Sequence, residues 1–168
     1  MTRPRAVLVG PPGAGKTTVG RLLAQRWQVP FRDTDADVET GAGKSIAELF
    51  FDDGEEAFRE LERAAVAAAV AEHTGVLSLG GGAVLSAVTR ELLREQHVLF
   101  LFVGLGEAAR RVGLNRDRPV LALNPRAALR DLLEQRLPLY REVATVEVDT
   151  DGRSAEQVVE ELLRTQPV

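Results

Sequence analysis

The stretch GPPGAGKTT at residues 10–18 constrains the fold of this chain more than any other feature. It matches the pattern GxxxxGK[ST], with Gly10, Gly15, Lys16 and Thr17 at the fixed positions. Glycines allow the backbone to curl so that successive N–H groups point at one anion, and a helix that begins there adds its positive end. We therefore predict a phosphate-binding loop at this place, between a first strand and a first helix.

Apolar runs alternate with helical patterns along the rest of the chain. The runs that predict strands lie at residues 5–10, 29–35, 75–82, 97–104 and 144–152. The helical patterns lie at 18–27, at 45–73 with a turn at Asp53 and Gly54, at 124–137 with Asn124 as N-cap and Pro125 after it, and at 154–165 with Ser154 as N-cap. Strands that are apolar on both faces and separated by helices indicate a parallel sheet with helices on each side. We predict an α/β fold of three layers, with five parallel strands.

Composition limits the classes of protein to which the chain can belong. A length of 168 residues suits one domain, so we expect a single unit over residues 1–168. The formal net charge is −4, which favours neither a nucleic-acid nor a membrane-surface partner. The chain has no cysteine and no apolar run long enough to span a membrane, and the short N-terminal apolar stretch has no cleavage site after it. We expect a soluble, cytoplasmic protein.

The predicted loop also has the side chains that nucleotide binding requires. Lys16 is placed to reach the outer phosphates, and the Thr17 hydroxyl is placed to bind Mg2+. A glycine-rich turn without a ligand is the alternative. We predict a nucleoside triphosphate as ligand, specifically ATP with Mg2+. The contacts expected from this loop are those of Gly13, Ala14, Gly15, Lys16, Thr17 and Thr18.

Two other polar segments follow predicted strands. Asp33 and Asp35 end the second strand, and the glycines at 80–82 end the third. Because ligands of open parallel sheets bind outside the carboxyl ends of the strands, we expect both segments to meet the phosphate loop in one site. Asp33 could hold a Mg2+-bound water, and Asp35 could accept a hydrogen bond or a proton from an alcohol. The alternatives are an acid-rich helix N-terminus and a plain turn.

Two arginines add a possible receptor for a small carboxylate. Arg59 lies on the predicted long helix with Glu62 three residues on, and Arg136 lies near an apolar helix face. Guanidinium groups match a carboxylate in a two-point fork. An exposed ion pair for the first and a surface side chain for the second are the ordinary alternatives. The segment 113–124 is either a connecting loop or a mobile lid.

Taken together, these segments resemble the shikimate kinase family. The blocks GPPGAGKTT, DTD, DGEEAFRELE, SLGGGAV, RP at 118–119 and RLPLY occur in the family's order and approximate spacing over almost the whole chain. The resemblance implies the nucleoside-monophosphate-kinase type of P-loop fold with a short lid. It implies transfer of the γ-phosphoryl group of ATP to the 3-hydroxyl of shikimate, in aromatic amino-acid biosynthesis. A monomer is expected.

The resemblance also implies a role for each matching residue. Lys16, Asp35 and Arg118 would be catalytic, with Arg118 on the lid, and Thr17 and Asp33 would serve the metal. The shikimate contacts would be Asp35, Arg59, Gly80, Gly81, Gly82 and Arg136. Arg111 and Arg153 would enclose the adenine, although Ala155 stands where many relatives have Pro.

Three rival interpretations remain open at this point. Gluconate kinase and adenylate kinase share the loop and the fold, but the DTD and GGG blocks argue against both. A P-loop binding module without turnover is the third. Outside the site, His73 and His97 lack partners at metal or triad spacing, and Trp27 and Tyr140 are expected to pack against the protein body.

Overall fold

The computed structural model describes residues 2–113 and 124–165. Its helices and strands, in chain order, are β1 (Ala6–Val9), α1 (Lys16–Trp27), β2 (Phe31–Asp33), α2 (Thr34–Ala42), α3 (Ile46–Glu72), β3 (Val76–Ser78), the 3-10 turn η1 (Ala83–Leu85), α4 (Ala87–Leu93), β4 (Val98–Phe102), α5 (Leu105–Arg111), α6 (Pro125–Val143), β5 (Val146–Asp149) and α7 (Ala155–Arg164).

The five strands form one parallel sheet in the order β2-β3-β1-β4-β5. β1 therefore lies in the middle, with β3 on one side and β4 on the other. The register aligns Leu8, Ser78 and Asp33 across three neighbouring strands. Because the chain leaves all three strands at the same edge, the segments after β1, β2 and β3 meet there. This arrangement is the physical basis of the site described below.

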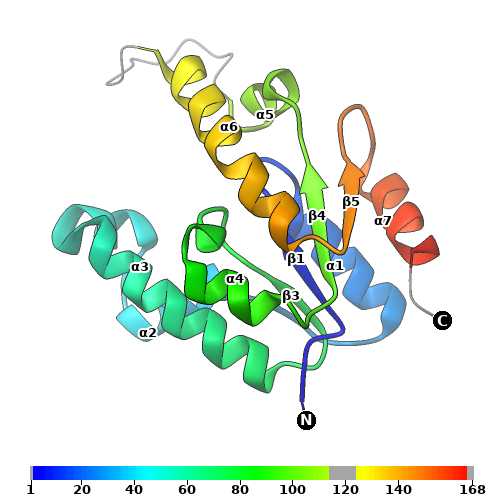
Figure 1. The fold of residues 1–168 in the computed structure, drawn as a ribbon, viewed down its shortest axis with the longest axis horizontal. Coiled ribbons are helices and arrows are strands. Elements are labelled where there is room, and N and C mark those ends of the chain that lie inside the picture. The colour runs from blue at the N-terminus through cyan, green and yellow to red at the C-terminus, as the bar shows by residue number, and fades with distance from the viewer. Residues whose placement is uncertain (1, 114–123, 166–168) are drawn as a thin grey trace.

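Helices cover both faces of the sheet, and the strand side chains alternate between two cores. On one face α1 and α7 pack against Leu8, Leu99 and Leu101, while on the other α3, α4 and α6 pack against Val7 and Phe100. Figure 1 shows α3 and α4 on the opposite side of the sheet from α1 and α7. The predicted three-layer fold with five parallel strands is confirmed. No helix within the described ranges is long and apolar enough to cross a membrane.

The predicted helix boundaries are mostly confirmed by their caps. Asn124 caps α6 with Pro125 in the first turn, and Ser154 caps α7 in a reciprocal pair with Gln157. The predicted turn near Gly54 is a break inside α3, where Gly54 has φ +88°. This left-handed conformation is one that glycine adopts without strain.

Several boundaries differ from the prediction, and two of these differences bear on the site. The second strand ends at Asp33 instead of residue 35, because the Asp33 side chain accepts a hydrogen bond from the backbone N–H of Asp35 and so caps α2. The late helix runs on to Val143, beyond its predicted end at residue 137. Pro138 removes one N–H donor there, but the burial of Tyr140 and Val143 in the core stabilises the last turns.

Candidate active site

The phosphate loop connects β1 to α1. Gly13 and Gly15 have φ of +83° and +89°, values that other residues adopt only with strain, so the glycines of the pattern are required by the turn itself. Gly15 is the N-cap of α1 and offers no side-chain acceptor to the first N–H groups of the helix. The Lys16 ammonium donates to the carbonyl oxygens of Gly10 (2.7 Å) and Pro11 (3.1 Å), which keeps it over the loop.

A cavity of about 280 Å³ lies beside this loop. Its walls come from the last residues of β2 and β3 and from the segments that follow β1, β2 and β3. The lining residues are Gly13, Gly15, Lys16, Thr17, Thr18, Asp33, Asp35, Ser78 and Leu79. The expected meeting of the phosphate loop with the two aspartates therefore occurs in the structure, and Leu79, the residue before the glycine segment at 80–82, also lines the cavity.

The charged side chains that line the cavity shift one another's pKa values. Burial raises the pKa of Asp35 to about 6, helped by the negative charges of Asp33 and Glu62 and opposed by Lys16. Burial also lowers the pKa of Lys16 to about 8, against the attraction of Asp35 and Asp33. At neutral pH the aspartate is ionised and the lysine is charged. The cavity thus offers a cation for phosphate oxygens and, close by, a carboxylate that can take up a proton near neutrality.

The donors around the cavity suit Mg2+ bound together with a nucleotide. Mg2+ is usually held by one or two carboxylates, a hydroxyl and substrate phosphates, with water completing the shell. Thr17 and Asp33 supply such a hydroxyl and carboxylate. In the described part of the chain, no group of three or more His, Cys, Asp or Glu side chains is arranged to hold a metal ion.

Each glycine of the segment 80–82 lies against a polar side chain or the phosphate loop. A Cβ atom added to Gly80 would come 2.5 Å from the Asp35 Oδ1 atom, and one added to Gly82 would come 2.7 Å from the Arg59 Cζ atom. A Cβ atom at Gly81 would come 3.1 Å from Pro12 Cδ. None of the three has a positive φ. Close approach, and not backbone conformation, therefore requires glycine here.

Arg59 forms an ion pair with Glu62, but the pair is buried where the ordinary interpretation expected an exposed one. The Nη1–Oε1 distance is 2.9 Å, and the side chains are only 18% and 4% exposed. Within the described residues the Arg59 Nε and Glu62 Oε2 atoms are buried without hydrogen-bond partners. A buried guanidinium N–H without a partner is costly, so this arrangement is suited to a ligand with its own polar atoms.

Arg136 approaches the glycine segment from α6. Its Nη1 atom would lie 3.5 Å from a Cβ atom at Gly81, and its positive charge lowers the pKa of Lys16. Arg136 and Arg59 therefore lie beside adjacent glycines, Gly81 and Gly82. The structure brings together the two arginines that were expected to bind one carboxylate.

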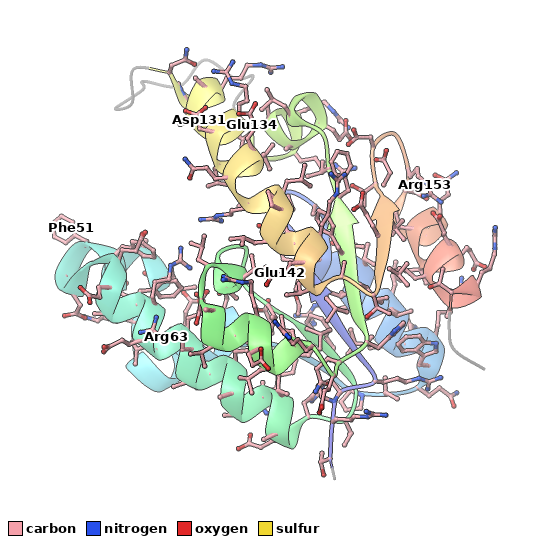
Figure 2. The ribbon with its side chains drawn as sticks, in the orientation of Figure 1. Phe51, Arg63, Asp131, Glu134, Glu142 and Arg153 are labelled. Atoms are coloured by element: carbon pink, nitrogen blue, oxygen red, sulfur yellow. The ribbon has the colours of Figure 1, made fainter. Side chains whose placement is uncertain are left out.

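A second cavity of about 300 Å³ is lined by Ala14, Gly15 and Thr18 of the phosphate loop and by residues of α5 and α7. Arg111 and Arg153, the two arginines predicted to enclose the adenine, both line it. Arg111 donates to the carbonyl oxygens of Gly13 (3.0 Å) and Thr150 (2.9 Å), and Arg153 donates to that of Asp149 (3.0 Å). Figure 2 shows Arg153 at the end of the molecule where β5 leads into α7. Arg118, and the predicted lid apart from its first and last residues, lie outside the described residues.

Two site residues were underestimated from the sequence. Glu62 was assigned only as the ion-pair partner of Arg59, yet its charge also acts on Asp35. Tyr140 was assigned to the protein body, yet its hydroxyl donates to the Gly81 carbonyl oxygen at 2.5 Å. The spacing of Tyr140 from Arg136, one helical turn, was the available signal for the second.

Comparison with known proteins agrees with this geometry. The family model described as "Shikimate kinase" matches residues 12–166. The chain belongs to the shikimate kinase family. A shikimate kinase of Saccharopolyspora erythraea is 64% identical over 161 residues, covering 95% of this chain and 92% of the relative. A shikimate kinase of Streptomyces coelicolor is 55% identical over 163 residues, covering 97% and 95%.

Solved structures support the same placement. The shikimate kinase of Acinetobacter baumannii in complex with shikimate superposes with a TM-score of 0.89 at 36% identity, covering 98% of this chain and 92% of that one. A gluconokinase of Sinorhizobium meliloti reaches a TM-score of 0.58 at 23% identity, with 98% and 92% covered, and so shares the fold alone. The predicted family and P-loop kinase fold are confirmed, and the chain is an ATP-dependent small-molecule kinase.

Proposed function

We propose that this shikimate kinase transfers the γ-phosphoryl group of ATP to the 3-hydroxyl of shikimate, giving 3-phosphoshikimate and ADP, within the cavity between the phosphate loop and the glycine segment. One observation carries the assignment of the site. The phosphate loop and the Asp33–Asp35 pair line one cavity at the carboxyl edge of the sheet, and the glycine segment lies against Asp35 and Pro12 there, because β1, β3 and β2 are neighbours.

The nucleotide end of the site consists of the phosphate loop and α1. Backbone N–H groups of residues 13–18 bind the β- and γ-phosphates, and Lys16 neutralises charge on the outer oxygens. Thr17 would hold Mg2+ directly and Asp33 through water. Bound there, Mg2+ would supply positive charge that offsets the negative charge of the phosphates. Arg111 and Arg153 enclose the adenine.

The acceptor end consists of Asp35, the glycine segment and the two arginines. Arg59 and Arg136 bind the substrate carboxylate, and the main chain of Gly80–Gly82 is the floor on which the ring lies. Asp35 accepts the hydrogen bond of the reacting hydroxyl. Since its pKa is about 6, Asp35 is ionised at neutral pH and can receive the proton as the phosphoryl group is transferred.

Charge that develops during transfer needs a further cation. The transition state of phosphoryl transfer is loose and spreads negative charge over three oxygens, so positioning and neutralisation dominate catalysis. We assign this role to Arg118, on a lid within residues 113–124. We further propose that the chain acts as a single kinase domain over residues 1–168, as a cytoplasmic monomer without a nucleic-acid or membrane partner.

Product analysis tests this function and its rivals together. Purified protein is incubated with MgATP and shikimate, gluconate or AMP in turn, and the products are identified by phosphorus and proton NMR. We expect phosphorylation of shikimate only, on its 3-hydroxyl. A phosphate at another hydroxyl would contradict the placement of Asp35, and phosphorylation of gluconate or AMP in place of shikimate would contradict the acceptor assignment.

A further inference from the structure

Tyr140 is a buried side chain that none of the roles above uses. Its side chain lies on α6, is 1% exposed, and stacks on Phe100 of β4 with ring centroids 5.0 Å apart. The ring thus packs as an ordinary core aromatic would. The hydroxyl group, in contrast, makes a polar contact: it donates a hydrogen bond to the Gly81 carbonyl oxygen at 2.5 Å.

The hydrogen bond to Gly81 acts on more than one atom. The Gly81 carbonyl and the Gly82 N–H belong to the same peptide unit, and the described residues contain no cis peptide bond. In a trans peptide these two groups point in opposite directions. Fixing the carbonyl therefore fixes the direction of the Gly82 N–H, which three successive glycines would otherwise leave free to rotate.

The two arginines of the acceptor site also lie close to the Tyr140 hydroxyl. Arg136 precedes Tyr140 by one turn of α6, and the positive charges of Arg136 and Arg59 both act to lower the pKa of the Tyr140 phenol. Despite these cations, burial raises the pKa of Tyr140 to about 12, so the hydroxyl is protonated at every pH at which the enzyme works. It remains a donor to Gly81.

We propose that Tyr140 is a positioning residue that holds the Gly81–Gly82 peptide, beside Arg136 and Arg59, in the arrangement that receives the acceptor carboxylate. This inference rests on the proposed function, because it presumes an acceptor with a carboxylate at this place. Arg136 lies beside Gly81 and Arg59 lies beside Gly82, so one arginine is next to each residue of this peptide unit. Without the Tyr140 hydroxyl, binding the acceptor must also order this peptide, which weakens binding.

The test is the variant Tyr140→Phe, which keeps the ring and its stacking on Phe100. We expect the KM for shikimate to rise about tenfold, an amount that corresponds to about 1.4 kcal/mol. The kcat and the KM for ATP should stay within about twofold of the wild-type values. With the methyl ester of shikimate, which lacks the charged carboxylate, the variant and the wild type should have similar KM values.

A matched control separates positioning from loss of a hydrogen-bonded hydroxyl in general. The Thr145 hydroxyl accepts from the Val98 N–H at 2.9 Å and donates to the Gln96 carbonyl oxygen at 3.3 Å. These contacts lie at the amino end of β4, away from the site. Thr145→Val should lower the melting temperature and leave both KM values unchanged.

Three results would overturn the inference. These are an unchanged shikimate KM in Tyr140→Phe, an equal rise for the acid and its methyl ester, or an equal loss for ATP and shikimate. Failure of the function itself looks different, because the wild-type protein would then release no ADP in response to shikimate.

Discussion

Arg59 donates a 2.9 Å hydrogen bond to Glu62, and the same carboxylate helps to raise the pKa of Asp35. One buried acid thus acts on both parts of the acceptor site, the arginine assigned to the carboxylate and the aspartate assigned to the hydroxyl. The Glu62 side chain is only 4% exposed, so water screens its charge little and the charge acts strongly on both residues.

The variant Glu62→Gln should affect both parts at once. Loss of a charge-assisted hydrogen bond to Arg59 should raise the KM for shikimate about tenfold. Loss of the negative charge should lower the pKa of Asp35, so the acid limb of the kcat/KM profile, expected near pH 6 in the wild type, should move to lower pH. Steady-state kinetics between pH 5 and 8 measure both effects. Glu60→Gln, at an exposed position on the same helix, is the control.

The variant Gly82→Ala should damage acceptor binding by displacing a side chain. The new Cβ atom would lie 2.7 Å from the Arg59 Cζ atom, so the guanidinium must move away from its place beside Glu62. We expect the KM for shikimate to rise at least tenfold and the KM for ATP to change little. Gly41→Ala is the control, because nothing lies within 4 Å of the position a Cβ atom would take there. Equal losses for the two substrates would contradict the assignment.

The variant Asp35→Asn should stabilise the folded protein while abolishing most activity. The pKa of Asp35 is raised from 3.8 to about 6 in the folded state, so the native protein binds the proton more tightly than the unfolded chain. Stability is therefore lost as pH rises through this window, and the cost persists at neutral pH. The shift corresponds to at most about 3 kcal/mol, and partial exposure reduces our expectation to about 1 kcal/mol.

Thermal unfolding at two pH values checks the stability effect of Asp35→Asn. At pH 7.5 the melting temperature should rise by about 2–4 °C, the size expected for about 1 kcal/mol in a chain of this length. Near pH 4 the gain should largely disappear, because the carboxyl group is then mostly protonated in the native protein. The same gain at both pH values would show that burial of charge is not its cause.

The variant Arg118→Ala tests the cation assigned to the lid. An arginine that stabilises the phosphoryl-transfer transition state contributes on the order of 10³ to 10⁵ in rate. We expect kcat to fall by about 10³ or more while calorimetry records shikimate binding of wild-type strength. Arg126→Ala, on the first turn of α6, provides the comparison. A near-normal kcat would remove Arg118 from the catalytic residues.

Local sequence patterns predicted the parts of the site that depend on backbone conformation and on the arrangement of the strands. The phosphate loop follows from glycines that the turn requires, and the meeting of Asp33 and Asp35 with this loop follows from a parallel sheet whose strands share one carboxyl edge. No local pattern indicated which of the charged side chains are buried. Whether the Arg59–Glu62 pair is exposed or enclosed depends on how α3 packs against the glycine segment, which brings together residues about 20 positions apart.

Tyr140 illustrates the same limit over a longer distance. An aromatic residue with apolar neighbours is most often core, and its ring does pack in the core. Its hydroxyl contacts Gly81, 59 residues earlier in the chain, and this contact exists only because α6 continues through Pro138. The helix was predicted only to residue 137, so the contact between Tyr140 and Gly81 could not be inferred from the sequence. In the structure, tertiary packing of the last turns outweighs the low helix propensity of proline.

The rate of ADP release from MgATP, measured with and without shikimate, tests the central claim most directly. If one cavity holds both the phosphates of ATP and the acceptor hydroxyl, shikimate should raise the rate at least a hundredfold, and Asp35→Asn should lose most of this increase. If ATP binds but shikimate does not raise the rate, the chain is a nucleotide-binding module, and the assignment of the acceptor site to shikimate is wrong.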